Sequence, residues 1–500
     1  MSVSNTDRTA SQYSGTSGLM HEEPLLFEHA HEKATSISLP GVVGELSNEL
    51  QAFTRTENAN IPGLSEPETV RHFVRLSQWN HAIETGFYPL GSCTMKYNPR
   101  VNEQVVRLPG LSGIHPDQPE ESVQGALALL YELQNWLGEI TGLPHTTLQP
   151  AAGAHGEWTG LMMIRAALDA RGESHRNKVL VPDSAHGTNP ASAALCGMQT
   201  VEIKSTAEGR VDLNELKAHL DNDVAALMLT NPNTAGMFES DIAEICRLVH
   251  EAGGFVYGDG ANLNALVGIA KVGDMGIDCL HINVHKTFST PHGGGGPGGG
   301  PVVVNDTLAA FLPTPRIEKV AETYKIIQQD ETSIGQVLGS IGQVGVLLRA
   351  AAYIAAFGKN HLHKIAEDAV LNANYILARL KDSYHVPFEG LCKHECLLTD
   401  EIQNRHGIKT LDIAKRLIDL GFHPMTVYFP LVVHGAMLIE PTESESRETI
   451  DAFCDAMLEI AEACEKGDTE EIHKAPLLPI RLRLDETAAA RKPILVWPNH

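Results

Sequence analysis

A lysine stands between a short apolar run and a glycine-rich segment in the middle of the chain. The run covers residues 280–284, Lys286 follows it, and an almost continuous series of glycines begins at Gly293. Burial disfavours the charged form of a lysine side chain, and a neutral amine condenses with an aldehyde to a Schiff base. The glycines let the backbone approach a ligand and offer amides to its anionic groups, whereas Pro297 and Pro301 argue against a freely flexible linker.

Other polar residues follow the predicted strands of the same region. His186 comes after the first strand, Thr230 after the third, and Asp259 with Ala261 after the fourth, while Lys286 follows the fifth. A pyridoxal phosphate site needs this inventory: an acid at the pyridine nitrogen, a flat side chain on the ring, hydrogen-bond donors and a lysine for the imine. These residues therefore predict pyridoxal phosphate chemistry.

A Gly- and Ala-rich turn precedes another predicted helix within residues 149–165. The turn contains Gly153, Ala154 and His155. Small residues at the N-terminus of a helix leave backbone N–H groups free, and such groups suit a phosphate. Taken alone, this turn does not establish a phosphate site.

Simpler interpretations of these residues remain open at this point. Asp259 is also compatible with a turn residue beside glycines, and His186 with a hydrogen-bonded loop histidine. A metal cluster of His281, His285 and His292 is disfavoured, because this stretch is predicted as a strand and a turn rather than a helix. No metal is expected, and the combination of residues is more specific than any one of them.

The elements that position these side chains follow from the apolar pattern. Strands are expected at 178–181, 200–203, 225–229, 255–257, 279–282 and 301–304, with helices at 122–137, 211–220 and 242–252. This alternation is typical of an α/β protein with a mainly parallel sheet, whose ligands bind beyond the carboxyl ends of the strands. Residues 320–390 are expected to be helical, residues 424–439 to hold strands, and Thr442 with Glu445 to form a capping box.

Length and composition limit the class of protein. The 500 residues allow a large domain with smaller ones, and the net charge of −24 disfavours nucleic-acid or membrane binding. The eight cysteines are scattered without a CxxC pair, and no segment is apolar for long enough to cross a bilayer. These features predict a cytoplasmic protein with reduced thiols.

The predicted organisation has five parts. They are a disordered tail (1–20), an N-terminal arm with an irregular loop region (21–120), a large cofactor-binding domain (121–320), a small C-terminal α+β domain (321–475) and an extended C-terminal tail (476–500).

From about residue 65 onward the chain resembles the pyridoxal-phosphate-dependent P-protein of the glycine cleavage system. The motifs that carry the resemblance are GFYPLGSCTMKYNP (86–99), SAHGTNPASA (184–193), GDGANLNA (258–265), NVHKTFSTPHGGGGPGGGP (283–301), YFPLVVHGAMLIEPTESES (428–446) and RLDETAAARKP (483–493). The length and AAGAHGE at 151–157 are similar to the separate second subunit of the two-subunit bacterial form. The resemblance implies the aspartate-aminotransferase-like fold, also called fold type I.

The resemblance also implies roles for individual residues. Lys286 matches the Schiff-base lysine, Asp259 the partner of the pyridine nitrogen, and His186 the residue that stacks on the ring. The turn Gly153, Ala154 and His155 matches the phosphate-binding turn. Three further cofactor contacts are expected, at Thr230, Ala261 and His285.

The implied reaction and partners follow from the family. Glycine loses CO₂, and the remaining aminomethyl group passes to the lipoyl arm of the H-protein. A first subunit of similar fold is expected as a partner in a heterotetramer of two dimers. Two alternatives are another fold type I lyase or aldolase that acts on a small amino acid, and a non-catalytic scaffold subunit. Lys286 beside Asp259 argues against the scaffold.

Overall fold

The computed structural model describes residues 23–29, 47–57, 63–293, 296 and 298–496. The disordered tail predicted for residues 1–20 lies outside these residues. The chain divides into two compact units, one of residues 1–86 with 474–500 and the other of residues 87–473. The described helices of the first unit are α1 (Leu26–His29), α2 (Asn48–Gln51), α3 (Glu66–Trp79) and α17 (Glu486–Arg491). The residues of the predicted cofactor site all belong to the second unit.

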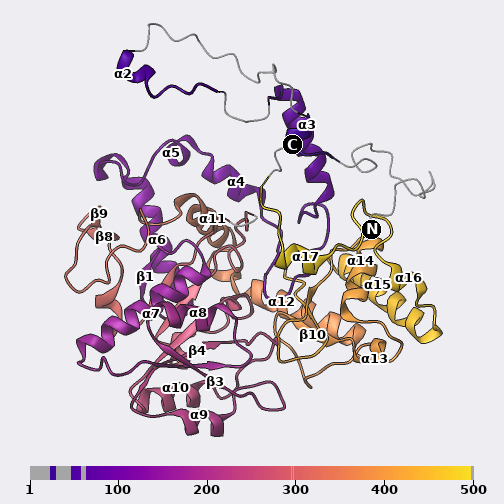
Figure 1. Cartoon of the computed structure of the whole chain (residues 1–500). Coiled ribbons are helices and arrows are strands. Elements are labelled where there is room, and N and C mark those ends of the chain that lie inside the picture. Colours follow the sequence, from indigo (N-terminus) through magenta and orange to yellow (C-terminus); the bar gives the residue numbers. More distant parts are fainter. Residues whose placement is uncertain (1–22, 30–46, 58–62, 294–295, 297, 497–500) are drawn as a thin grey trace. The chain divides into compact units, whose positions relative to one another are not determined.

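A seven-stranded sheet is the centre of the second unit (Figure 1), with the strand order β1-β7-β6-β5-β4-β2-β3. The strands are β1 (His145–Thr147), β2 (Lys178–Pro182), β3 (Gln199–Ile203), β4 (Val224–Thr230), β5 (Phe255–Gly260), β6 (Cys279–Ile282) and β7 (Val302–Val304). Neighbours from β3 to β6 are parallel, whereas β7 pairs antiparallel with both β6 and β1. The predicted α/β fold with a mainly parallel sheet is thus confirmed.

Helices pack on both faces of this sheet, so strands β4, β5 and β6 are buried on both sides. One apolar cluster joins the sheet to α6 (Gln124–Thr141), α9 (Leu213–His219) and α10 (Ile242–Glu251). A second cluster on the other face joins it to α7 (Gly153–Ala170) and α8 (Thr188–Leu195). The N-termini of α7 and α8 follow the loops that carry the predicted site residues.

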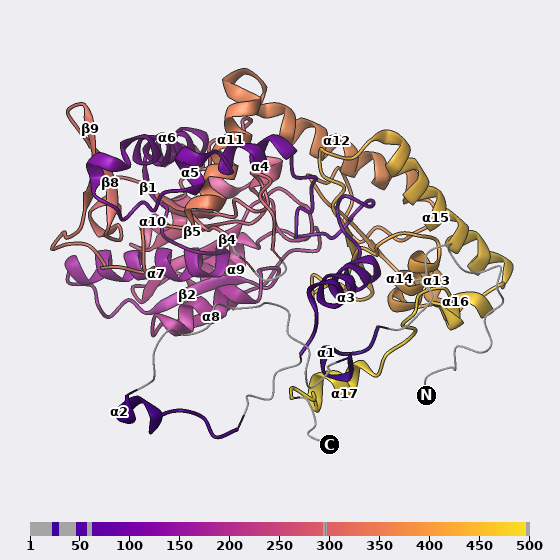
Figure 2. The same ribbon diagram turned by 90° about the horizontal axis from the view of Figure 1, so that it is seen from above.

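A smaller α+β layer follows in the same unit. Its three-stranded antiparallel sheet has the order β10-β12-β11, formed by β10 (Cys396–Thr399), β12 (Ala436–Ile439) and β11 (Thr426–Val427). Its helices are α12 (His363–Leu380), α13 (Glu401–Asn404), α14 (Thr410–Asp419) and α15 (Arg447–Lys466), and Figure 2 shows α12 beside α15. The remaining α-helices and β-strands of the described residues are α4 (Arg100–Val106), α5 (Pro109–Ser112), β8 (Arg316–Val320), β9 (Thr323–Ile327), α11 (Val344–His361) and α16 (Glu470–Lys474).

Two local predictions were wrong. Strand β9 forms a hairpin with β8 in a segment expected to be helical, because its β-branched and aromatic residues favour a strand. The capping box predicted for Thr442 is absent, since Ser446 caps α15 through the amide of Thr449 and Thr442 has a positive φ of 62°. Glu443, the residue after Thr442, contacts the buried Lys96 at 2.7 Å instead of opening the helix.

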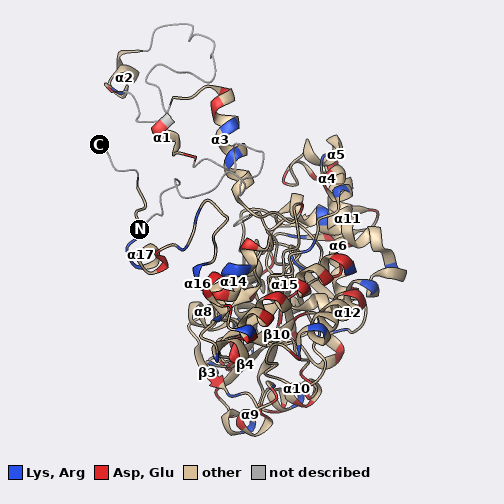
Figure 3. Cartoon of the chain, turned by 90° about the vertical axis from the view of Figure 1, so that its right-hand side faces the viewer, with Lys and Arg blue, Asp and Glu red and all other residues tan. Residues whose placement is uncertain are grey.

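Acidic and basic residues both occur along the described helices of the second unit. Figure 3 shows acidic residues interspersed with basic ones along helices such as α14 and α15. Within the described residues, no helix combines the length and apolarity that a membrane crossing requires.

Candidate active site

Lys286 lies directly after β6 in a turn that closes on the strand end. Its amide donates to the Asn283 carbonyl at 3.0 Å, and the residue is only 9% exposed. Its Nζ donates to the backbone carbonyl of Ser92 at 2.9 Å. The lysine is therefore buried, as predicted, and a loop from near residue 90 holds its amine.

Asp259 lies near the end of β5, between the ends of β4 and β6. The strand register pairs it with Thr230 on one side and His281 on the other. Its carboxylate accepts from the Ala261 amide at 2.9 Å and from Asn189 Nδ2 at 3.2 Å, and His281 Nε2 lies 3.5 Å away. Burial acts to raise the pKa of Asp259, but His281, Ala261 and Asn189 hold it below its ordinary value. A carboxylate that stays ionised can keep a pyridine nitrogen protonated.

A second buried carboxylate supports Asp259. Glu157 of α7 accepts from Thr188 Oγ1 at 2.7 Å, Asn189 Nδ2 at 3.0 Å and Ser192 Oγ at 3.2 Å, all at the start of α8. Asn189 thereby joins Glu157 to Asp259. The sequence analysis did not single out Glu157 or Asn189, although both lie inside motifs that it quoted.

A chain of hydrogen bonds leads along β6 to His285. His281 Nε2 contacts Asn283 Oδ1 at 2.6 Å, and Asn283 Nδ2 contacts His285 Nε2 at 3.3 Å. Since the amide nitrogen donates, Nε2 of His285 accepts and its hydrogen resides on Nδ1. Burial, together with His292 and Lys286, lowers the pKa of His285 to about 3, so the ring is neutral. Its buried Nδ1 has no hydrogen-bond partner among the described residues.

The predicted phosphate turn begins helix α7. Gly153 is the first residue of this 18-residue helix, and no side chain caps it. A Cβ on Gly153 would lie 2.5 Å from Asn283 Nδ2, so only glycine fits beside that side chain. His155 Nδ1 accepts from the amide of Ala151 at 3.1 Å, while its buried Nε2 has no hydrogen-bond partner in the described part of the chain. Ala154 is exposed.

The end of the glycine-rich segment packs on the same turn. Gly300 donates its amide to the Pro150 carbonyl at 2.8 Å, and a Cβ on Gly300 would lie 2.1 Å from the Ala152 oxygen. Some of the glycines are thus required by backbone-to-backbone packing. Gly294 and Gly295 lie outside the described residues.

His186 and Thr230 complete the predicted set. His186 follows β2, and its ring centroid lies 5.6 Å from that of Phe429. Its Nδ1 and the Oγ1 of Thr230 are both buried and lack hydrogen-bond partners within the described part of the chain. All predicted site residues therefore come from the ends of β2, β4, β5 and β6 or from the start of α7.

The residues present fit a bound pyridoxal phosphate. Buried polar atoms of Thr230, His186, His155 and His285 find no hydrogen-bond partner among the residues that the structure describes. Native proteins leave few such atoms without partners. An uncapped helix end and the Nδ1–H donor of His285 suit a phosphate, and an ionised Asp259 suits a protonated ring nitrogen.

A group that the sequence analysis missed comes from the smaller layer. Three residues flank the ends of β10 and β12, namely His394, Glu395 and Glu440. One ring nitrogen of the histidine and one carboxylate oxygen of each glutamate lie within 4.8 Å of one another. All three are fully buried. The signal available in the sequence was the polar pair His394-Glu395 directly before an apolar run.

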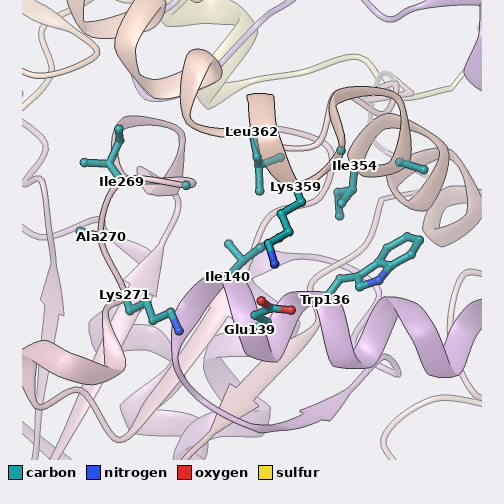
Figure 4. A pocket seen from close by; sticks show the side chains of 12 residues that line it. Trp136, Glu139, Ile140, Ile269, Ala270, Lys271, Ile354, Lys359 and Leu362 are labelled. Atoms are coloured by element: carbon teal, nitrogen blue, oxygen red, sulfur yellow. The ribbon is translucent and has the colours of Figure 1, made fainter.

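A surface pocket lies elsewhere in the fold (Figure 4). It has a volume of about 490 Å³, and Trp136, Ile140, Ile354 and Leu362 contribute apolar lining while Lys271 contributes charge. None of the predicted site residues lines it.

Comparison with known proteins gives consistent matches over the chain. A family model described as "Glycine cleavage system P-protein" matches residues 43–326, and one described as "Glycine dehydrogenase, C-terminal domain" matches residues 365–477. A probable glycine dehydrogenase (decarboxylating) subunit 2 from Caulobacter vibrioides is 54% identical over 490 residues, covering 97% of this chain and 93% of the relative. A protein of the same description from Exiguobacterium sibiricum is 54% identical over 478 residues, covering 95% and 97%.

Solved structures share the fold. A glycine decarboxylase (P-protein) of the glycine cleavage system, in inhibitor-bound form, aligns with a TM-score of 0.70 at 20% identity, covering 83% of this chain and 93% of that one. The cysteine desulfurase CsdA from Escherichia coli aligns with a TM-score of 0.58 at 14% identity, covering 80% and 99%. The family matches and the highly similar relatives show that this chain belongs to the glycine cleavage system P-protein family.

Proposed function

We propose that this chain is the catalytic, pyridoxal-phosphate-binding second subunit of a two-subunit glycine decarboxylase. Membership of the P-protein family carries the activity, the decarboxylation of glycine in the glycine cleavage system. One observation carries the catalytic assignment to this chain. Buried Lys286 follows β6 and an ionised Asp259 lies near the end of its parallel neighbour β5, beside buried polar atoms that lack hydrogen-bond partners among the described residues.

Each predicted residue has a proposed task toward the cofactor. Lys286 would hold it covalently through Nζ, and Asp259 would keep a proton on the ring nitrogen. His186 would lie against the ring, and Thr230 and Ala261 would line its edge. Gly153, Ala154 and His155 at the start of α7, together with His285, would bind the phosphate. The supporting observations are the uncapped helix end and the unpartnered Nδ1–H of His285.

The cofactor, when bound, supplies the electron sink that accepts the charge left behind as CO₂ departs. The protein's own contribution is to keep that sink positively charged and the substrate fixed. Asp259 does the first because its buried carboxylate remains ionised. Glu157 and Asn189 hold Asp259 in place, and such preorganised charge lowers the barrier most where charge develops.

The partners are proposals that rest on the family. The substrate is glycine, and a first P-protein subunit would complete a heterotetramer of two dimers. A lipoylated H-protein would receive the aminomethyl group. All eight cysteines are free thiols, which fits a reducing compartment, and we propose a cytoplasmic location.

An isotope-exchange experiment tests the proposed function. Purified chain, cofactor, companion subunit and lipoylated H-protein are incubated with glycine and labelled bicarbonate, and label in the glycine carboxyl group is measured. We expect exchange that requires this chain and is stimulated by the H-protein. Lys271→Ala, which alters a pocket lysine outside the site, should retain exchange, whereas Lys286→Ala should not. Exchange that persists without this chain would exclude it as the catalyst, and exchange that persists in Lys286→Ala would exclude Lys286 as the cofactor lysine.

A further inference from the structure

The buried group of His394, Glu395 and Glu440 lies where two strands of the smaller sheet end together. Cys396 of β10 pairs with Ile439 of β12, which brings the residues before the first strand next to Glu440 after the second. All three side chains are fully buried. Buried carboxylates are rare unless they hold partners, so their contacts indicate a task.

The two glutamates hold a strained turn. Glu395 accepts from the amide of Ser92 at 2.7 Å, and Glu440 accepts from the amide of Thr94 at 2.9 Å and from its Oγ1 at 2.6 Å. Ser92 and Thr94 have positive φ values of 63° and 48°. Non-glycine residues in this region persist only where the surroundings enforce them. The carboxylates supply that enforcement.

The same turn contacts the catalytic lysine. The carbonyl of Ser92 accepts the hydrogen bond from Lys286 Nζ. Cys93, half-buried between the two held residues, feels the charges of Lys286, Glu440 and Glu395. A continuous path of contacts therefore runs from the glutamates through the turn to Lys286.

The charged and titratable groups that face the glutamates are Lys286, Lys96, His394 and Cys93. Burial raises the pKa of Glu440 to about 7 against the opposing effect of Thr94 and Lys286. Burial and the charge of Glu440 raise the pKa of Glu395 well above its usual range. Lys96 is already paired with Glu443 at 2.7 Å. Glu440 therefore changes its charge near neutral pH, and the raised pKa of Glu395 favours its protonated form.

We propose that Glu395 and Glu440 are positioning residues that hold the Ser92–Thr94 turn against Lys286, and that protonation of Glu440 loosens this hold. The proposal rests on the proposed function and deepens it, because it adds a pH-dependent support for the catalytic amine. Hydrogen bonds to an ionised carboxylate are stronger than those to a neutral acid. As the pH falls through about 7, the turn loses its strongest acceptor, and activity falls with it.

Amide hydrogen exchange tests the hold without any assay of activity. Peptides that span residues 88–98 are followed by mass spectrometry in the full-length chain between pH 6 and 8, after correction for intrinsic rates. Wild-type protein should lose protection of this segment on acidification. Glu440→Gln should show the low-pH behaviour at every pH, with roughly tenfold faster exchange at pH 8 than wild type, since one charged acceptor is lost.

Glu239→Gln is the matched control. Glu239 is also buried, also accepts a backbone amide, from Val211 at 3.1 Å, and has a pKa raised by burial. Its charged neighbours are Arg210 and Asp241 rather than Lys286. This variant should keep the wild-type dependence of protection on pH. If both substitutions changed the protection of residues 88–98 equally, Glu440 would have only a general structural role, and the proposal would be overturned.

A pH profile of the isotope exchange provides the second measurement. In wild type and Glu239→Gln, turnover should rise between pH 6 and 8. In Glu440→Gln, turnover should be slower and should not change over the same pH range. A wild-type profile in Glu440→Gln, or loss of activity on chelation of metal ions, would overturn the proposal. Absent turnover in wild-type protein would instead count against the proposed function, and amide exchange would still decide the role of the glutamates.

Discussion

Two buried carboxylate sites, one at Asp259 and one at Glu440, both lie near Lys286, and they differ in charge. Burial acts to raise the pKa of Asp259 and of Glu440 alike. Asp259 nevertheless has a lowered pKa, because His281, Ala261 and Asn189 all favour its ionised form. Glu440 keeps a raised pKa of about 7, because its two hydrogen bonds from Thr94 and the charges of Lys286 and Lys96 do not offset the effect of burial.

The comparison shows that burial alone does not set the charge of a carboxylate. How far the hydrogen bonds and neighbouring positive charges offset burial decides between a permanent charge and an exchangeable proton. The large-domain site is built for a permanent charge, as a protonated cofactor ring requires. The small-domain pair is built to exchange a proton near neutral pH.

The largest effect is expected from replacing Lys286, the residue that lies near both carboxylate sites. Lys286→Ala should abolish covalent cofactor attachment and decarboxylation while the fold is retained, because the substitution removes the imine nitrogen and little packing. Borohydride reduction followed by mass spectrometry measures attachment, and the labelled exchange measures activity. Retained attachment with normal turnover would show that another amine carries the cofactor.

The next largest effect is expected from replacing Asp259, the carboxylate that stays ionised. Asp259→Asn keeps the shape but leaves the ring nitrogen without its anionic partner. We expect a fall in turnover of at least about 10²-fold, which corresponds to about 2.7 kcal/mol of barrier. Turnover and cofactor content are measured together, and a fall of less than about tenfold at full cofactor occupancy would assign the ring nitrogen to another group.

A smaller effect is expected at the phosphate end, which touches neither carboxylate. A Cβ on Gly300 would lie 2.1 Å from the Ala152 oxygen, whereas nothing lies within 4 Å of one on Gly339. Gly300→Ala should therefore weaken cofactor binding, by roughly tenfold or more if the turn shifts, and Gly339→Ala should not. Cofactor titration followed by its visible absorbance compares the two variants. Equal affinities would show that the turn does not shape the phosphate site.

The glycines outside the described residues allow a related test. Replacing Gly294 and Gly295 together by alanine should retain the bound cofactor and lose exchange supported by the H-protein, if this part of the segment lines the path of the lipoyl arm. Exchange close to wild type at saturating H-protein would return these glycines to the role of a linker.

The smallest expected effect is on stability. The stability contributed by Glu440 and that contributed by Asp259 should change with pH in opposite directions. Because the pKa of Glu440 is raised from 4.5 to about 7 on folding, the stability it contributes is present below pH 4.5 and is lost as the pH rises through about 7. The pKa of Asp259 is lowered, so its contribution is present at neutral pH and is lost only in acid, below the ordinary value of 3.8. Glu440→Gln should flatten the decline in melting temperature between pH 5 and 8.

Melting curves at several pH values measure this difference. Asp259→Asn should leave the slope of melting temperature against pH unchanged between pH 5 and 8, because Asp259 does not titrate there. A Glu440→Gln slope that matches wild type would mean that Glu440 keeps an ordinary pKa in the folded protein.

The sequence by itself determined the large sheet and where its polar residues gather. Apolar runs of strand length are local signals, and the carboxyl ends of parallel strands meet at one edge, so Asp259, His186 and Lys286 could be placed without coordinates. The quoted motifs also contained Glu157 and Asn189. The hydrogen bonds from Asn189 to Glu157 and to Asp259 could not be read from the motifs, since they depend on how α7 packs beside α8.

Only the tertiary structure decided what supports Lys286 from the other side. Ser92 lies far before the lysine in the chain, and His394, Glu395 and Glu440 lie far after it, so no local period relates them. Their meeting depends on the pairing of β10 with β12 and on a turn in a strained conformation. The capping of α15 by Ser446 has the same cause, since Glu440 and Glu443 before it are held by buried contacts to Thr94 and Lys96. Long-range hydrogen bonds outweigh local capping preference there, and sequence patterns do not encode that balance.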